Sequence, residues 1–81
     1  MHTYRTARGT VVHAARISSI GAGVNDGVVL HLGAYGNKEF DKAWSDLWKP
    51  TVGAWLVMND STGARSVLAD EAFAERFTAT A

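Results

Sequence analysis

The chain has 81 residues, which suits a single domain spanning 1–81, and it has no cysteine to form a stabilising disulfide. Eight basic and eight acidic residues give a net charge of zero, which argues against a general polyanion binder because phosphate-backbone binding needs a basic excess. Its apolar runs are far shorter than the roughly 20 residues of a membrane helix, and its N-terminus lacks the apolar core of a signal peptide, so we expect a cytoplasmic protein without a membrane partner.

The N-terminal part predicts a frayed or edge strand followed by a longer strand. Residues 1–9 are polar apart from Tyr4, whereas residues 10–20 are rich in β-branched side chains. Neither face of the longer strand is cleanly apolar. A bulge between Val12 and Ile17 that switches the buried face would explain this pattern.

A glycine-rich segment predicts a hairpin in the next part of the chain. Residues 21–27 contain three glycines and an Asn-Asp pair, which is typical of a turn. A phosphate loop is disfavoured, because the third glycine comes one residue late for the phosphate motif and a strand, over residues 28–32, follows where that motif requires a helix. A second turn at 34–37 returns the chain through residues 38–41.

The hydrophobic period then changes to that of a helix over residues 40–48. The large apolar residues of this segment share one helix face, at spacings i, i+4, i+7 and i+8: Phe40, Trp44, Leu47 and Trp48. The helix ends at Lys49, because the residue before Pro50 is disfavoured in the helical region.

Residues 50–77 have the clearest pattern in the chain. The segment 52–59 is apolar on both faces, as expected for a central strand. A hairpin loop at 60–63 leads into a short returning strand over residues 65–68.

A helix over residues 69–77 is predicted to close the domain, followed by a tail over 78–81. Asp70 and Glu71 lie in the first turn of this helix, where their negative charges suit the helix macrodipole. The side chains expected in the core of this part of the chain are Trp55, Val57, Phe73 and Phe77.

The predicted element order is β-β-β-α-β-β-α, which indicates an α+β domain. We expect a small, strongly bent antiparallel sheet or SH3-like barrel of about five strands. A short middle helix and a C-terminal helix complete it.

The sequence offers no catalytic or metal-binding set, so we expect a non-enzymatic protein with no metal and no cofactor. Nucleophilic catalysis needs a nucleophile, a base and a group that orients the base, and the histidines belong to no such motif. His13 and His31 would be cross-strand neighbours if their strands pair, but a metal site needs a third ligand. Glu71 and Glu75 have the ordinary spacing of a solvated helix face.

The candidate ligand- or partner-binding residues are arginines and aromatic side chains: Arg5, Arg8, Tyr35, Trp44, Trp48 and Arg65. Arginine matches phosphate with bidentate geometry. Tyr35 lies on a glycine-flanked turn, from which an aromatic ring can stack on a base or nucleotide. The helix face with Trp44 and Trp48 is either core or an interface.

Residues 50–77 resemble the C-terminal half of a group of small phage and prophage proteins. The shared pattern is Pro-x-x-Gly-x-aromatic-x-Val, then Gly-x-x-Ser, then Phe-x-x-x-aromatic. The matching residues are Pro50, Gly53, Trp55, Val57, Gly63, Ser66, Glu71, Phe73 and Phe77. Leu68 and Ala69 replace the Ser-Pro that starts the final helix in that group, so we expect the start of the helix either to fray or to use Asp70 as its cap.

The resemblance implies a phage-encoded accessory protein that acts by binding. Our main hypothesis is a homo-oligomer in the host cytoplasm that counters host defence. It would sequester a signalling nucleotide or inhibit a host defence protein. The alternatives are a small-barrel nucleic-acid-binding module, which the neutral net charge disfavours, and a virion structural or assembly protein.

Overall fold

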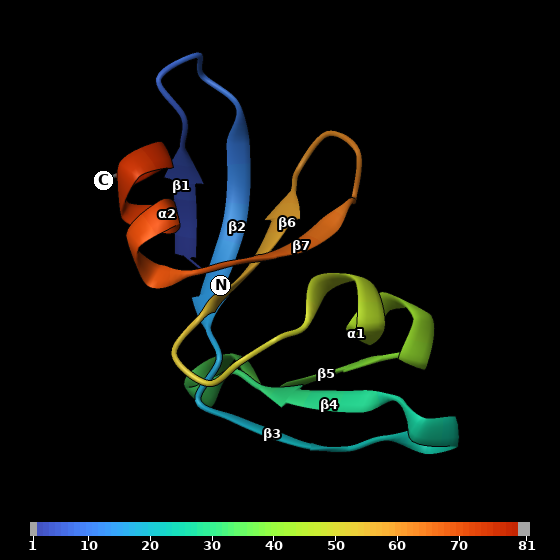
Figure 1. Cartoon of the computed structure of the whole chain (residues 1–81). Coiled ribbons are helices and arrows are strands. Elements are labelled where there is room, and N and C mark those ends of the chain that lie inside the picture. Colours follow the sequence, from blue (N-terminus) through green and yellow to red (C-terminus); the bar gives the residue numbers. More distant parts are fainter. Residues whose placement is uncertain (1, 80–81) are drawn as a thin grey trace.

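The computed structural model describes residues 2–79, which form two antiparallel sheets and two short helices (Figure 1). The first sheet has the order β7-β6-β2-β1-β8, with bounds Arg65–Leu68, Trp55–Asn59, Val11–Arg16, His2–Arg5 and Thr78–Ala79. The second has the order β3-β4-β5, with bounds Ser19–Ala22, Val28–His31 and Asn37–Phe40. The helices are α1 (Lys42–Trp48) and α2 (Asp70–Arg76), and 3₁₀ turns η1 (Val24–Asp26) and η2 (Gly33–Tyr35) flank β4.

These elements confirm the predicted α+β class with antiparallel strands, a middle helix and a C-terminal helix. The described residues contain more strand segments than the five expected, and the strands divide between two sheets. In Figure 1, α2 lies beside the first sheet, and α1 lies between the second sheet and the β6–β7 hairpin.

The predicted bulge in the second strand is wrong. The register of β2 against β1 and against β6 runs without interruption. Val12 and Ala14 pack in one hydrophobic cluster, whereas Ala15 and Ile17 pack in another. The buried face therefore changes because the end of β2 lies between two cores, so both of its faces are covered.

The first core lies between the two sheets, and the second lies under α2. The first contains Ala15, Ile17, Leu30, Leu32, Phe40, Ala54 and Leu56. The second contains Val12, Ala14, Val57 and Phe73, with half-buried Tyr4, Trp55, Leu68 and Phe77 packed against them. Of the four core residues expected in the C-terminal part of the chain, Val57 and Phe73 are buried in this second core, and Trp55 and Phe77 are half-buried against it.

A capping side chain is present at the start of α1 but not at the start of α2. Asp41 caps α1, because its Oδ1 accepts a hydrogen bond of 2.8 Å from the Trp44 N–H. The N-cap position of α2 is Ala69, which makes no side-chain hydrogen bond, so the prediction that Asp70 caps this helix is wrong. Asp70 lies one position too late in the chain and binds Trp55 instead.

Two further expectations need correction. Residues 78 and 79 were expected in a tail but form β8, which pairs with β1, while residues 80–81 of that tail lie outside the described residues. The apolar face predicted for the middle helix is divided, because Phe40 belongs to β5. Trp44 packs against the first core, whereas the Leu47 side chain is 73% exposed.

Candidate functional site

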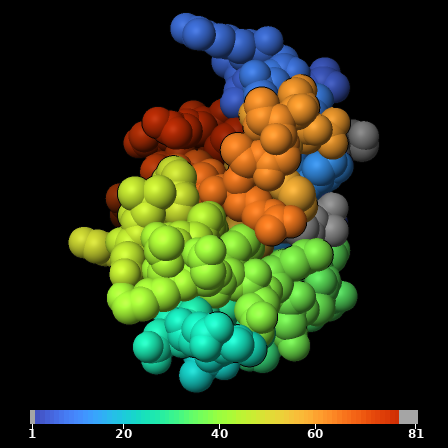
Figure 2. Space-filling view, turned by 90° about the vertical axis from the view of Figure 1, so that its right-hand side faces the viewer, coloured from blue at the N-terminus to red at the C-terminus, as the bar shows by residue number. Residues whose placement is uncertain are grey.

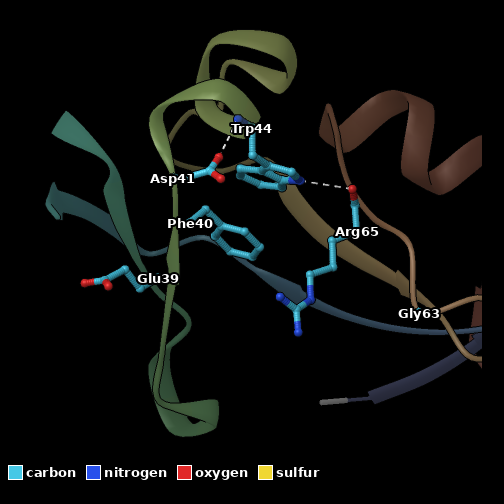
Figure 3. A pocket seen from close by; sticks show the side chains of 6 residues that line it. All are labelled: Glu39, Phe40, Asp41, Trp44, Gly63 and Arg65. Atoms are coloured by element: carbon cyan, nitrogen blue, oxygen red, sulfur yellow. Dashed lines mark hydrogen bonds between the residues drawn. The ribbon is translucent and has the colours of Figure 1, made fainter. Parts of the chain in front are cut away.

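A groove of about 390 Å³ lies between the end of β5 and the start of β7 (Figure 3). It is lined by Glu39, Phe40, Asp41, Trp44, Gly63 and Arg65. Trp44 and Arg65 are two of the binding residues predicted from the sequence, and the fold brings them together from α1 and β7. Phe40, which the sequence placed on the helix face, lies at the end of β5 and forms the floor between them.

Three side chains in the groove hold one another in place. The Trp44 ring stacks on the Phe40 ring at a centroid distance of 3.8 Å. The Arg65 guanidinium carbon lies 5.5 Å from the Phe40 centroid, which is cation–π geometry. The Trp44 Nε1–H donates a hydrogen bond of 3.2 Å to the Arg65 carbonyl oxygen. Figure 3 shows all three side chains pointing into the groove.

The Arg65 guanidinium can still bind an anion. Within residues 2–79 it forms no ion pair, although two carboxylates line the same groove. Asp41 is engaged as the cap of α1, and the Glu39 side chain points away from Arg65 in Figure 3. A guanidinium fixed on an aromatic ring with free N–H donors is suited to a carboxylate or phosphate.

Arg5 and Arg8 lie together on the β1–β2 hairpin, far from the groove in the fold. Both are exposed, and Figure 2 shows this hairpin projecting from one end of the molecule. Its turn is ordered, because the Thr6 N–H donates to the Thr10 carbonyl at 3.0 Å and the Thr10 N–H donates to Thr6 Oγ1 at 3.0 Å. The hairpin therefore presents Arg8 on a defined turn.

The other two predicted aromatic residues lie at separate places. Tyr35 is exposed in η2, but its ring already packs edge-on against His2 at 5.5 Å. It also lines a mainly apolar cavity of about 300 Å³ beside Trp55. Trp48 is 37% exposed and lines another cavity of about 300 Å³, next to Phe77.

A polar network that the sequence did not indicate joins three elements. Asp70 Oδ1 accepts hydrogen bonds from Trp55 Nε1 at 2.8 Å and from the Arg16 guanidinium at 2.5 Å. The Arg16 guanidinium carbon also lies 5.0 Å from the Trp55 ring centroid. The Trp55 hydrogen bond and, after it, the Arg16 charge lower the pKa of the Asp70 carboxyl below its ordinary value of 3.8.

This network predicts an acid-sensitive contribution to stability. The folded state favours the Asp70 carboxylate, so its contribution is complete above the ordinary pKa and is lost as the pH falls through the lower folded pKa. We expect Asp70→Asn to reduce the dependence of the unfolding temperature on pH between about pH 6 and pH 2. Asp46→Asn, in the exposed Lys42–Asp46 pair, is the control. Equal slopes for wild type and Asp70→Asn would contradict the assignment.

The histidines do not form a shared site. His13 lies in the first sheet and His31 in the second, so their strands do not pair and the two histidines are not cross-strand neighbours. His13 Nε2 lies 2.8 Å from Asp60 Oδ1, and His31 Nδ1 lies 2.7 Å from Asn37 Oδ1. The described residues contain no group of three side chains that could hold a metal ion. That the protein is not an enzyme stays a prediction.

Comparisons with known proteins give a match in structure alone. The sequence matches no protein-family model and no curated protein. Among solved structures, the fold is similar to the solution NMR structure of the monomeric form of the phage L decoration protein, with a TM-score of 0.75 and 23% sequence identity. The match covers 94% of this chain and 57% of that chain, so this chain spans little more than half of the phage L protein. None of the helices in residues 2–79 is long and apolar enough to cross a membrane.

Proposed function

We propose that this protein is a structural component of a phage virion that binds to the outside of the particle. The observation that carries the proposal is the fold, which follows that of the phage L decoration protein over 94% of this chain. The role is the virion alternative raised from the sequence. The anti-defence hypothesis, with its nucleotide or host-protein ligand, has no comparable observation in its favour.

The β1–β2 hairpin is the surface best suited to contact a particle. It carries the exposed Arg5 and Arg8, and no acidic residue occurs before Asp26 in the sequence. Arg16, the third arginine of this region, is neutralised by Asp70. An ordered turn with two unneutralised positive charges binds an acidic surface with little loss of conformational entropy.

Exposed apolar side chains near the end of α1 support the predicted homo-oligomer. Leu47 is 73% exposed, Val52 is 64% exposed and Trp48 is 37% exposed. Apolar groups of this kind are commonly covered at interfaces between subunits. Native mass spectrometry tests the assembly, and a monomer at every protein concentration would contradict it.

Co-sedimentation with phage heads tests the proposed function. We expect the protein to pellet with heads of the phage whose genome carries the gene, and to saturate at a fixed ratio to the capsid subunits. The double variant Arg5→Gln and Arg8→Gln should bind about tenfold more weakly, because two charges leave the contact. The control Lys42→Gln removes an exposed positive charge from α1, away from the hairpin (Figure 1), and should bind normally.

Two results would contradict this proposal. The first is failure to pellet with heads at low ionic strength, where electrostatic contacts are strongest. The second is thermal stabilisation of the protein by cyclic nucleotides without head binding, which would favour the nucleotide-sequestering hypothesis instead.

A further inference from the structure

Strand β3 is an edge of the second sheet, and its sequence differs from that of the other edges. Edge strands usually carry charged residues that discourage pairing with another chain. In this protein, β5 carries Lys38 and Glu39, β7 carries Arg65, and β8 contributes only two described residues. In contrast, residues 17–25 contain neither a charged residue nor a proline. Among the edge strands within residues 2–79, β3 is therefore the best suited to accept a further strand.

Hydrogen bonds beside β3 show where its backbone groups point. Gly23 N–H donates to the Gly27 carbonyl, so these two residues form a hydrogen-bonded pair at the end of the β3–β4 ladder. Such pairs alternate along antiparallel strands, which makes Gly21 the next residue of β3 that bonds to β4. The N–H and C=O groups of Ile20 and Ala22 therefore point away from β4, toward the edge of the sheet.

The other side of β4 gives the same assignment. Leu32 N–H donates to the Gly36 carbonyl, which places Leu30 among the residues of β4 that bond to β5. Val29 then bonds to its register partner in β3, which is Gly21. Within the described part of the chain, no strand pairs with β3 on its outer side. Figure 1 shows β3 along one outer border of the molecule, so the space beyond its edge is open.

A second copy of β3 fits this edge because the strand is complementary to itself. In a two-fold antiparallel pairing centred on Gly21, Ile20 of each copy lies opposite Ala22 of the other. The outward N–H and C=O groups of both residues then find partners, because each Ile20–Ala22 pair exchanges both of its hydrogen bonds. Registers centred on Ile20 or on Ala22 place the other residue opposite position 18 or 24, outside the strand.

The side chains across this pairing are also compatible. Ile20 packs against the first core, and Ala22 lies on the same face of β3, so both cross-strand pairs are apolar. On the other face, Gly21 meets Gly21 of the second copy in a non-hydrogen-bonded pair, where two strands approach most closely. The pairing therefore places no like charges opposite each other.

We propose that β3 pairs with β3 of a second copy of this chain, about a two-fold axis at Gly21. The second sheets of the two copies then form one continuous antiparallel sheet. This inference goes beyond the virion role, and it gives the proposed homo-oligomer an interface separate from the exposed apolar residues of α1. Because the contact is limited to one strand, we expect a weak dimer with a dissociation constant on the order of 0.1 mM.

Charged residues at position 21 test the axis directly. This position accepts a side chain, because a Cβ there would meet only the flexible end of the His31 side chain. Gly21→Glu places two carboxylates opposite each other, and Gly21→Lys places two ammonium groups there. We expect each variant alone to dimerise about fivefold more weakly than wild type in sedimentation equilibrium at low ionic strength. An equimolar mixture should form a heterodimer at least as tightly as wild type, because opposite charges then meet.

Ala74→Glu and Ala74→Lys are the matched controls. Ala74 is exposed on α2, which lies beside the first sheet, so the same charges are introduced away from β3 (Figure 1). We expect both controls, alone and mixed, to dimerise like wild type. Amide hydrogen exchange gives a second measurement on the wild-type protein, which holds even if a variant at position 21 fails to fold. Protection of the Ile20 and Ala22 amides should rise with protein concentration.

Several results would overturn the inference. They are a wild-type monomer at about 1 mM protein, undiminished dimerisation of Gly21→Glu, and a mixture that dimerises no more tightly than its separate variants. A dimer lost in Leu47→Ser but kept in Gly21→Glu would overturn it in favour of α1. Protection of β3 that appears only after phage heads are added would overturn it in favour of a strand from the head protein. Dimerisation is measured without phage particles, so its failure is separate from a failure of head binding.

Discussion

Leu30→Ala is expected to destabilise the protein by about 2–5 kcal/mol. The Leu30 side chain is 0% exposed and lies on β4 in the core between the two sheets. Its truncation removes buried apolar surface and leaves a cavity that the surrounding strands fill only in part. Small domains have about 5–15 kcal/mol of stability in total, so this loss is a large fraction. Urea denaturation followed by tryptophan fluorescence measures it.

Leu47→Ala is the matched control for this prediction. It deletes the same atoms from a side chain that is 73% exposed on α1, and alanine suits a helix at least as well as leucine. We expect the free energy of unfolding to change by no more than about 0.5 kcal/mol. The measurement is made at a low protein concentration so that self-association does not contribute. A comparable loss of unfolding free energy in both variants would contradict the exposed position of Leu47.

Local sequence pattern predicted most elements but not their assembly into two sheets. The β4–β5 and β6–β7 hairpins and both helices lie close to the predicted positions, because turn residues and hydrophobic period are local signals. The partner of β2 is β6, some 40 residues later in the chain, and no local pattern encodes that pairing. The apolar residues of β2 therefore appeared irregular until both of its covered faces were known.

The candidate groove could be predicted only in part for the same reason. Trp44 and Arg65 were identified by residue type, but their contact joins α1 to β7 across the fold. Phe40 was assigned to the helix face, whereas Asp41 caps α1 and leaves Phe40 in the preceding strand. The site therefore depends on where one helix begins, which is the least certain feature of a sequence-based prediction.

The resemblance to small phage proteins rests on residues that specify a scaffold. Gly53 and Gly63 have positive φ values of 91° and 73°, and Val57 and Phe73 are buried in the second core. Residues chosen for turns and packing define a fold and carry no information about a ligand. This is why the pattern could not separate an anti-defence role from a virion role, and why the groove residue Trp44 lies outside it.

Gly27→Ala is the second variant with a large expected effect, because the backbone at this turn approaches too closely for a side chain. A Cβ atom at Gly27 would lie 2.4 Å from the Phe40 carbonyl oxygen and 3.0 Å from the Val24 carbonyl oxygen. Both are backbone atoms, so β5 or η1 must move to make room. We expect the free energy of unfolding to fall by about 1–3 kcal/mol, as is typical when extra atoms are inserted into a well-packed site. Urea denaturation measures this change.

Gly21→Ala on the neighbouring β3 separates this steric effect from a general effect of replacing glycine. Its Cβ would meet only the flexible end of the His31 side chain, at 3.4 Å. We expect the free energy of unfolding to stay the same or to rise by up to about 1 kcal/mol, because alanine reduces the conformational freedom of the unfolded chain. Equal stability of the two variants would show that the turn yields easily. In Gly27→Ala, displacement of Phe40 should also disturb its stacking on Trp44, so this variant should show altered tryptophan fluorescence, whereas Gly21→Ala should keep the wild-type spectrum.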